Sequence, residues 1–153
     1  KKGENHLPFL PEAPAMDVQE IIAALNARRP AFIDLLGGQV VAADRVERTC
    51  TFEFNVSTQF CHSVDVVQGG FITTMLDAAM SHAIFVSMED ITGVSSLEIK
   101  TSYLEPTRAG KLRVEGRVLK ASYKTAFLEG RLYNSEGLVA ATTSSVAKLV
   151  RAK

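Results

Sequence analysis

Residues 67–77 carry the residue types best suited to chemistry. The run Val67-Gln68-Gly69-Gly70 is followed by a single carboxylate, Asp77, seven residues after the second glycine. The glycines allow the backbone to turn sharply and to approach a ligand closely. They stand where a helix is expected to begin, so unpaired N–H groups and the positive end of the helix dipole would face developing negative charge. Such amide groups are suited to binding an oxyanion.

Asp77 is the other half of this arrangement. Its distance from Gly70 corresponds to about two helical turns, and it is the only formally charged residue between Val66 and Met88. A carboxylate in an apolar helix is costly unless it is paired or hydrogen-bonded, and such a carboxylate suits a base or a nucleophile. A structural alternative also fits the spacing, in which Asp77 hydrogen-bonds a neighbouring hydroxyl and does no chemistry.

The surrounding elements indicate an α+β domain with an antiparallel sheet and a helix against one face. Asp17 is a candidate N-cap of a helix that runs to about Arg29, and an apolar turn is expected near Phe32. The remaining expectations are strands within 39–57, a loop over 59–67, a long apolar helix over about 71–88, and strands near 97–103, 112–118, 127–133 and 138–150.

The long helix is apolar almost all round, which predicts a cover on more than one side. Its length would span a bilayer, but its polar residues and the mid-span Asp77 disfavour lipid. We therefore expect a helix buried in the protein and no membrane partner. A small sheet cannot enclose such a helix fully, so the pattern favours a dimer in which the partner supplies the missing cover.

Length and composition indicate a single domain. The chain has 153 residues, of which 46% are hydrophobic, and this is enough for one real core. Residues 1–16, with three prolines, predict a flexible N-terminal arm, and residues 17–153 one folded domain. The arm has no apolar core of a secretory signal, and two cysteines form no disulfide framework, so we expect a cytoplasmic location.

Charge and ligand spacing exclude several classes of partner. Acidic and basic residues balance at 17 each, which gives no field for nucleic acid. The three histidines and scattered acids form no metal site. The adjacent pair Cys61-His62 is a weak nucleophile candidate, because neighbouring residues seldom aim at each other. His82 is expected in the core or at an interface.

Two stretches joined in order carry a family resemblance. The first is His62-Ser63-Val64-Asp65-Val66-Val67-Gln68-Gly69-Gly70-Phe71 with Leu76-Asp77-Ala78-Ala79, and the second is the run from Ser96 to Pro106. Together they resemble the hotdog-fold thioesterases of the phenylacetate-degradation (PaaI-like) group, over roughly residues 35–150. The resemblance implies a hotdog fold, with an antiparallel sheet wrapped around a long central helix, in a homodimer. A dimer of dimers stays open as a higher assembly.

The resemblance also implies hydrolysis of an acyl-CoA thioester to the free acid and CoA. The backbone N–H of Gly69 would polarise the thioester carbonyl, with help from the Gln68 amide. The partner's Asp77 would activate water or attack the carbonyl itself, and Ser96 would lie near that carboxylate. CoA is part of the substrate, and no further cofactor is expected. Substrate contacts are expected from His62, Gly70, Phe71, Thr74, Ser122 and Lys124.

Three positions depart from the family pattern, and two alternative functions stay open. Gln68, Asp65 and His62 stand where relatives commonly carry His, Gly and Asn. One alternative is a hotdog dehydratase or hydratase acting on enoyl or hydroxyacyl thioesters, which Gln68 disfavours because that chemistry needs a histidine there. The other is a non-catalytic acyl-CoA-binding dimer. An apolar acyl pocket is expected from Phe71, Ile72, Met75 and Phe85, although the methionines Met75, Met80 and Met88 favour a core position.

Overall fold

A computed structural model describes residues 16–153, so nearly all of the arm predicted for residues 1–16 lies outside the described residues. The described chain runs from two short helices through a pair of strands to one long helix, and then through four long strands. The elements are α1 (Val18–Ala27), α2 (Ala31–Leu35), β1 (Gly38–Asp44), β2 (Thr49–Val56), the 3-10 turn η1 (Thr58–Phe60), β3 (Cys61–Ser63), β4 (Val66–Val67), α3 (Gly69–Ser87), β5 (Ile91–Tyr103), β6 (Gly110–Ala121), β7 (Thr125–Tyr133) and β8 (Val139–Arg151).

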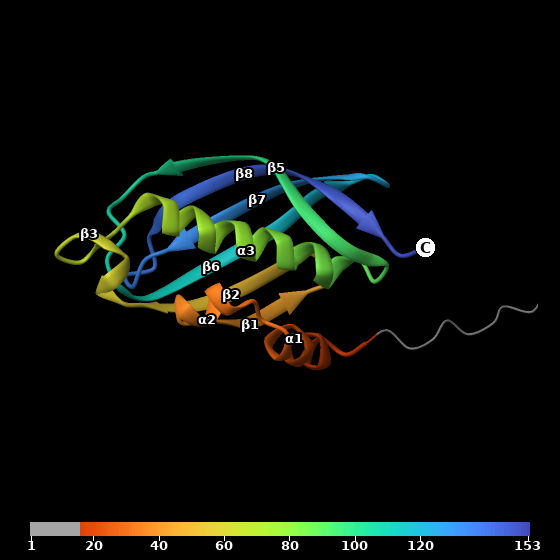
Figure 1. Cartoon of the computed structure of the whole chain (residues 1–153), viewed down its shortest axis with the longest axis horizontal. Helices are drawn as coiled ribbons and strands as arrows, with labels where there is room; N and C mark the ends of the chain where they lie inside the picture. The colour runs from red at the N-terminus through yellow and green to blue at the C-terminus, as the bar shows by residue number, and fades with distance from the viewer. Residues whose placement is uncertain (1–15) are drawn as a thin grey trace, which may run out of the picture.

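Within the described chain, six strands form one antiparallel sheet in the order β1-β2-β6-β7-β8-β5. The short strands β3 and β4 pair as a hairpin that leads directly into α3. The sheet curves around α3, while α1 and α2 lie on the β1 side (Figure 1). The predicted α+β fold, with an antiparallel sheet wrapped around a long helix, is confirmed.

The helix α3 sits directly on β6 because small residues line the contact. Gly116 and Gly130 are cross-strand partners on β6 and β7. A Cβ atom on Gly116 would lie 2.3 Å from the carbonyl carbon and oxygen of Ala79, so only glycine permits this approach. Ala79 and Ala83 are fully buried at the same contact. The middle of α3 is therefore held rigidly against the centre of the sheet.

One face of α3 is left open. The helix has the length and hydropathy of a membrane-crossing segment (19 residues, mean hydropathy 1.2), but half of that window is buried inside the fold. Among the residues of α3 that the sheet leaves partly or fully exposed, Gly70, Thr74, Asp77 and Ser81 recur every three or four residues and so share one face. The helix is therefore a core helix with one polar stripe facing outward.

The edge strand β5 differs most from its prediction. It begins at Ile91, six residues before the expected start. A β-bulge between Ser96 and Glu98 shifts the register, and Leu97 is 63% exposed. Because a bulge resets the alternation of side chains, Ser96 faces α3 together with Thr101 and Tyr103, and each of the three hydrogen-bonds to a residue of the helix.

Other element predictions were right in kind and inexact in extent. Asp17 is the N-cap of α1, but its side chain makes no capping hydrogen bond. The expected loop over 59–67 contains η1 and the β3–β4 hairpin instead. The long helix begins at Gly69 rather than Phe71. Its earlier start puts both glycines, Gly69 and Gly70, inside the first helical turn.

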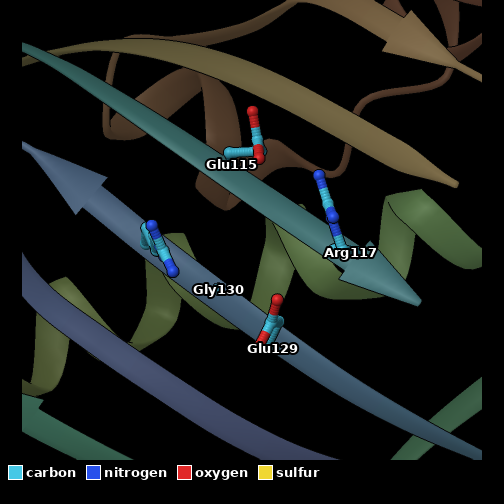
Figure 2. A pocket seen from close by; sticks show the side chains of 5 residues that line it. Glu115, Arg117, Glu129 and Gly130 are labelled. Carbon is cyan, nitrogen blue, oxygen red and sulfur yellow. The ribbon is translucent and has the colours of Figure 1, made fainter. Parts of the chain in front are cut away.

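The sheet face opposite α3 carries charge. Figure 2 shows Glu115 and Arg117 on β6 and Glu129 on β7 projecting from that face, with α3 behind the strands. The register places Glu115 opposite Arg131 and Arg117 opposite Glu129. Opposite charges in cross-strand pairs stabilise a sheet modestly. These residues line a hollow on the outer face of the sheet. That face lies on the side of the sheet away from α3 and its Asp77.

Candidate active site

The first turn of α3 presents two unused amide groups. Gln68 is the N-cap, and its carbonyl accepts the N–H groups of Phe71 (3.0 Å) and Ile72 (3.4 Å). Among the described residues no acceptor takes the N–H of Gly69 or Gly70. The Gln68 side chain is exposed and makes no capping hydrogen bond. The helix start can therefore donate hydrogen bonds to an incoming anion or carbonyl oxygen.

Asp77 lies at the boundary between α3 and β5, half-buried rather than enclosed in the core. Ser96 Oγ donates to Asp77 Oδ1 across 2.7 Å, which places Ser96 beside the carboxylate as the resemblance implies. This bond satisfies the structural alternative as well. However, Oδ2 has no partner among the described residues and stays available to water or substrate, which a purely structural carboxylate does not need.

Three residues to which the sequence gave no role complete the contact between β5 and α3. Tyr103 Oη donates to the carbonyl oxygen of Gly69 (2.8 Å) and contacts Thr73 Oγ1 (2.9 Å). Thr73 Oγ1 in turn contacts Thr101 Oγ1 (2.7 Å). We call Ser96, Thr101, Tyr103 and Thr73 the hydroxyl seam. The partners of the seam on the helix, Gly69, Thr73 and Asp77, are four residues apart and therefore lie about one turn from each other on α3.

Several predicted substrate contacts gather near the helix start. His62 is exposed on β3, which lies beside the beginning of α3 (Figure 1). Phe71 is 38% exposed, and its ring packs edge-on against Phe60 at 4.9 Å between centroids. Thr74 Oγ1 donates to the carbonyl of Gly70 (2.9 Å), so its proton is committed to its own helix. His62 and Phe71 are thus exposed near the helix start, while the Thr74 hydroxyl proton is used within α3.

Ser122 and Lys124 lie elsewhere in the protomer. They belong to the turn between β6 and β7, and Ser122 lines a groove with Ser87 at the far end of α3 and with Arg151. A 19-residue helix separates its two ends by about 27 Å. One protomer therefore does not bring these residues to the amides of Gly69 and Gly70.

The expected acyl pocket is partly wrong. Ile72 and Met75 are 2% and 0% exposed and pack in the core beneath the helix, so the protomer does not present them to a ligand. Met80 is also in the core, at 0% exposed. Phe85 instead lines a groove with Ile21 and Leu25 of α1. The error arose because apolar residues on a helix look alike in sequence whichever face they occupy.

The remaining titratable candidates have structural surroundings. His82 Nδ1 donates to the carbonyl of Ala78 (2.7 Å), and its ring stands edge-on to Phe52 at 4.9 Å. Burial lowers the pKa of His82, against a smaller opposing effect of that backbone bond. Burial raises the pKa of the Cys50 thiol to about 12, so it is unreactive. Within residues 16–153, no cluster of His, Cys, Asp and Glu side chains could hold a metal ion.

Comparison with known proteins points to one family. Residues 65–141 match the family model described as the thioesterase superfamily. A protein of Pseudomonas aeruginosa named as a candidate esterase is 26% identical over 129 residues, which are 84% of this chain and 95% of that protein. An uncharacterised protein of Schizosaccharomyces pombe is 33% identical over 78 residues, 51% of this chain. The match spans only 41% of the yeast protein's own length.

Solved structures share the fold over most of the chain. A candidate thioesterase of Ralstonia eutropha, related to phenylacetic acid degradation, superposes with a TM-score of 0.76 at 25% identity, covering 84% of this chain and 98% of its own. The PaaI protein of the E. coli phenylacetic acid degradation operon gives a TM-score of 0.74 at 17% identity, covering 84% and 91%. The second likeness shows the fold alone.

Proposed function

Because this chain belongs to the thioesterase superfamily, we propose that it hydrolyses acyl-CoA thioesters to a free carboxylic acid and CoA at a site shared by two protomers. Thioester hydrolysis is the coarse activity that family membership gives.

The observation that carries the proposal is the separation of the two reactive groups. Asp77 follows Gly69 by eight residues on one continuous helix, which corresponds to about 12 Å along the axis. A carbonyl oxygen and an attacking water each lie about 3 Å from their partners, so two groups this far apart along one helix favour a site completed across a subunit boundary. Asp77 of the partner subunit can meet the Gly69 amide if two α3 helices pack side by side through their open stripes.

The proposed reaction uses the two groups on opposite sides of the carbonyl. The Gly69 amide, with Gln68, binds the thioester oxygen, and Asp77 takes a proton from water as that water attacks the carbonyl carbon. The negative charge on oxygen is stabilised at the helix start. The intermediate then expels the CoA thiolate, which is protonated, and the acid is released. Direct attack by Asp77, through an anhydride that water then opens, is the other form of the same mechanism.

The substrate contacts follow from the same packing. His62 and Phe71 flank the helix start, where the acyl group and the end of the pantetheine arm would lie. We assign Ser122 and Lys124 to the CoA phosphates, with the turn that carries them belonging to a protomer other than the one that offers the Gly69 amide.

The test is an Asp77→Asn variant assayed with acetyl, hexanoyl, lauroyl, benzoyl and phenylacetyl thioesters of CoA. The amide keeps the shape and can still accept from Ser96 Oγ, but it cannot take a proton. We expect kcat to fall by about 10²–10⁴-fold on the preferred substrate. Asp34→Asn, at an exposed carboxylate of α2 that pairs with Arg29, is the matched control and should keep full activity.

Three outcomes would contradict the proposal. Unchanged turnover in Asp77→Asn would remove Asp77 from the chemistry. A wild-type protein that binds the CoA thioesters but hydrolyses none would favour the acyl-CoA-binding alternative, and loss of enoyl absorbance with crotonyl-CoA would favour the hydratase.

A further inference from the structure

The hydroxyl seam reaches the first turn of α3. Its contacts fall on Asp77, Thr73 and Gly69, each about one turn from the next. The strand that supplies the other side, β5, is an edge strand of the sheet. Strand β5 pairs with β8 on one side only, and polar contacts with α3 hold its other side.

The direction of each hydrogen bond can be deduced. A carbonyl oxygen only accepts, so the single hydroxyl proton of Tyr103 is used on Gly69. Thr73 must then donate to Tyr103 Oη, and Thr101 to Thr73 Oγ1. Three hydrogen bonds thus point one way and end on the Gly69 carbonyl. Chains of this kind polarise one another and strengthen each bond.

The end of this chain acts on a peptide group at the site. The carbonyl of Gly69 and the N–H of Gly70 belong to one planar peptide unit. A donor on the carbonyl fixes the plane and makes the N–H a stronger donor. A Cβ atom on Gly70 would have nothing within 4 Å, so this residue borders open space, and its N–H has no acceptor among the described residues.

The tyrosine ring explains the first glycine. A Cβ on Gly69 would lie 3.0 Å from Tyr103 Cζ and 3.1 Å from Tyr103 Oη, closer than a methyl group normally approaches. The Tyr103 side chain is nevertheless 51% exposed, so it contributes little to the core. Its position is used at the helix start rather than in packing.

We propose that Tyr103 is a positioning residue for the oxyanion donors of the thioesterase site. Through its bond to the Gly69 carbonyl it orients and polarises the Gly69–Gly70 peptide, and the Gly70 amide becomes a second donor to the thioester oxygen beside that of Gly69. Thr73 and Thr101 hold the hydroxyl in place. The inference rests on the proposed function, since the oxygen in question is that of the thioester.

The experiment compares Tyr103→Phe with Tyr133→Phe, a matched control on β7. Tyr103→Phe keeps the ring against Gly69 and removes only the hydroxyl. Loss of a direct oxyanion donor costs about 10²–10³-fold, so we expect an indirect effect of about tenfold on kcat, with little change in KM. Binding of an S-alkyl-CoA thioether, which lacks the carbonyl oxygen, should stay at the wild-type level in Tyr103→Phe. If Tyr103 instead formed a wall of the binding pocket, the variant would bind the thioether more weakly.

A second readout does not depend on turnover. The ¹⁵N resonance of Gly70 should move in Tyr103→Phe, because the Gly69 carbonyl of the same peptide unit loses a hydrogen bond. The Gly130 resonance should stay in place in this variant, and Tyr133→Phe should move neither resonance. If the wild type is active, either of two results for Tyr103→Phe would overturn the positioning role. One is a Gly70 resonance that does not move, and the other is a loss of thioether binding as large as the loss in kcat. A wild type that hydrolyses no thioester would instead remove the proposed function, and with it the oxyanion role of the Gly70 amide.

Discussion

At the scale of single residues, the orientation of Asp77 depends on Ser96. Ser96 Oγ is the one donor to the Asp77 carboxylate among the described residues, and without it the side chain can rotate away from the position in which we propose that it activates water. We expect Ser96→Ala to lower kcat about tenfold, since misplacement of a catalytic group by a fraction of an ångström already costs rate. Ser95→Ala, the exposed neighbour on the same strand, should leave kcat unchanged, and steady-state kinetics of both variants provide the check.

His82 predicts a pH dependence of stability. Its folded-state pKa is lowered by burial, so the unfolded chain binds the proton first as pH falls. Stability is then fully present above the unfolded value, near 6.5, and is lost progressively below it. Thermal unfolding followed between pH 5 and 8 should show a falling midpoint below about 6.5, and His82→Gln should flatten this slope. A slope that persists in His82→Gln but vanishes in His62→Asn would contradict this prediction, because the pH dependence would then come from His62.

The sequence predicted the site residues unevenly. Gly69 and Asp77 share one helix, so their spacing alone placed them two turns apart. Ser96 came from the resemblance, because strict alternation along its strand would have turned it away from the helix, and the bulge after it is what turns it inward. Tyr103 was missed because its contact with Gly69 depends on how an edge strand folds over a helix, which no local pattern encodes.

At the scale of elements, the packing of α3 on β6 depends on Gly116. A Cβ there would stand 2.3 Å from the backbone of Ala79, and backbone held by its own helix cannot yield as a flexible side chain does. We expect Gly116→Ala to destabilise the fold by about 2–3 kcal/mol, which lowers the unfolding midpoint by roughly 5–10 °C. Gly93→Ala, where the new Cβ would meet Val150 at an ordinary 3.5 Å, is the control. Calorimetry measures the unfolding midpoints of both variants, and equal midpoints would contradict this account.

The elements themselves were predictable where periodicity was strong. Helix α3 and the strands β6 to β8 have long apolar patterns, and each was found with an error of a few residues at its ends. The first half of β5 was missed because Gly93 and the mixed residues Thr92 and Ser95 break the alternation. Its pairing with β8, across the whole length of both strands, is a long-range contact that supplies what the local sequence lacks.

At the scale of the whole molecule, the open side of the protomer calls for a partner. Strand β5 is a 13-residue edge of the sheet, and beside it Leu97, Tyr103 and Leu104 are 63%, 51% and 57% exposed. A long edge with apolar side chains either pairs or aggregates. The same side carries Asp77 and the open stripe of α3, so a second copy placed there would cover the edge and complete the site at once.

Mixing two inactive variants would test the shared site directly. Asp77→Asn removes the base. Gly69→Pro removes the amide donor at a first helical position, and the extended Gln68 before it is compatible with proline. The proline Cβ would stand 3.0 Å from Tyr103 Cζ, so the half-exposed Tyr103 ring has to shift outward to admit it. In a twofold dimer of one variant with the other, one of the two sites regains both an intact amide and an intact carboxylate, while the second site loses both.

The size of the recovery follows from counting. Random exchange of subunits makes about half of all dimers mixed, and each mixed dimer carries one good site of two, so activity should return to about one quarter of wild type. Each variant alone should stay inactive, and mixed dimers isolated through two different affinity tags should reach about half. If tagged mixed dimers form and remain inactive, the amide and the carboxylate do not act across the boundary, and the 12 Å separation along α3 would have to be bridged within one protomer by a different pair of groups.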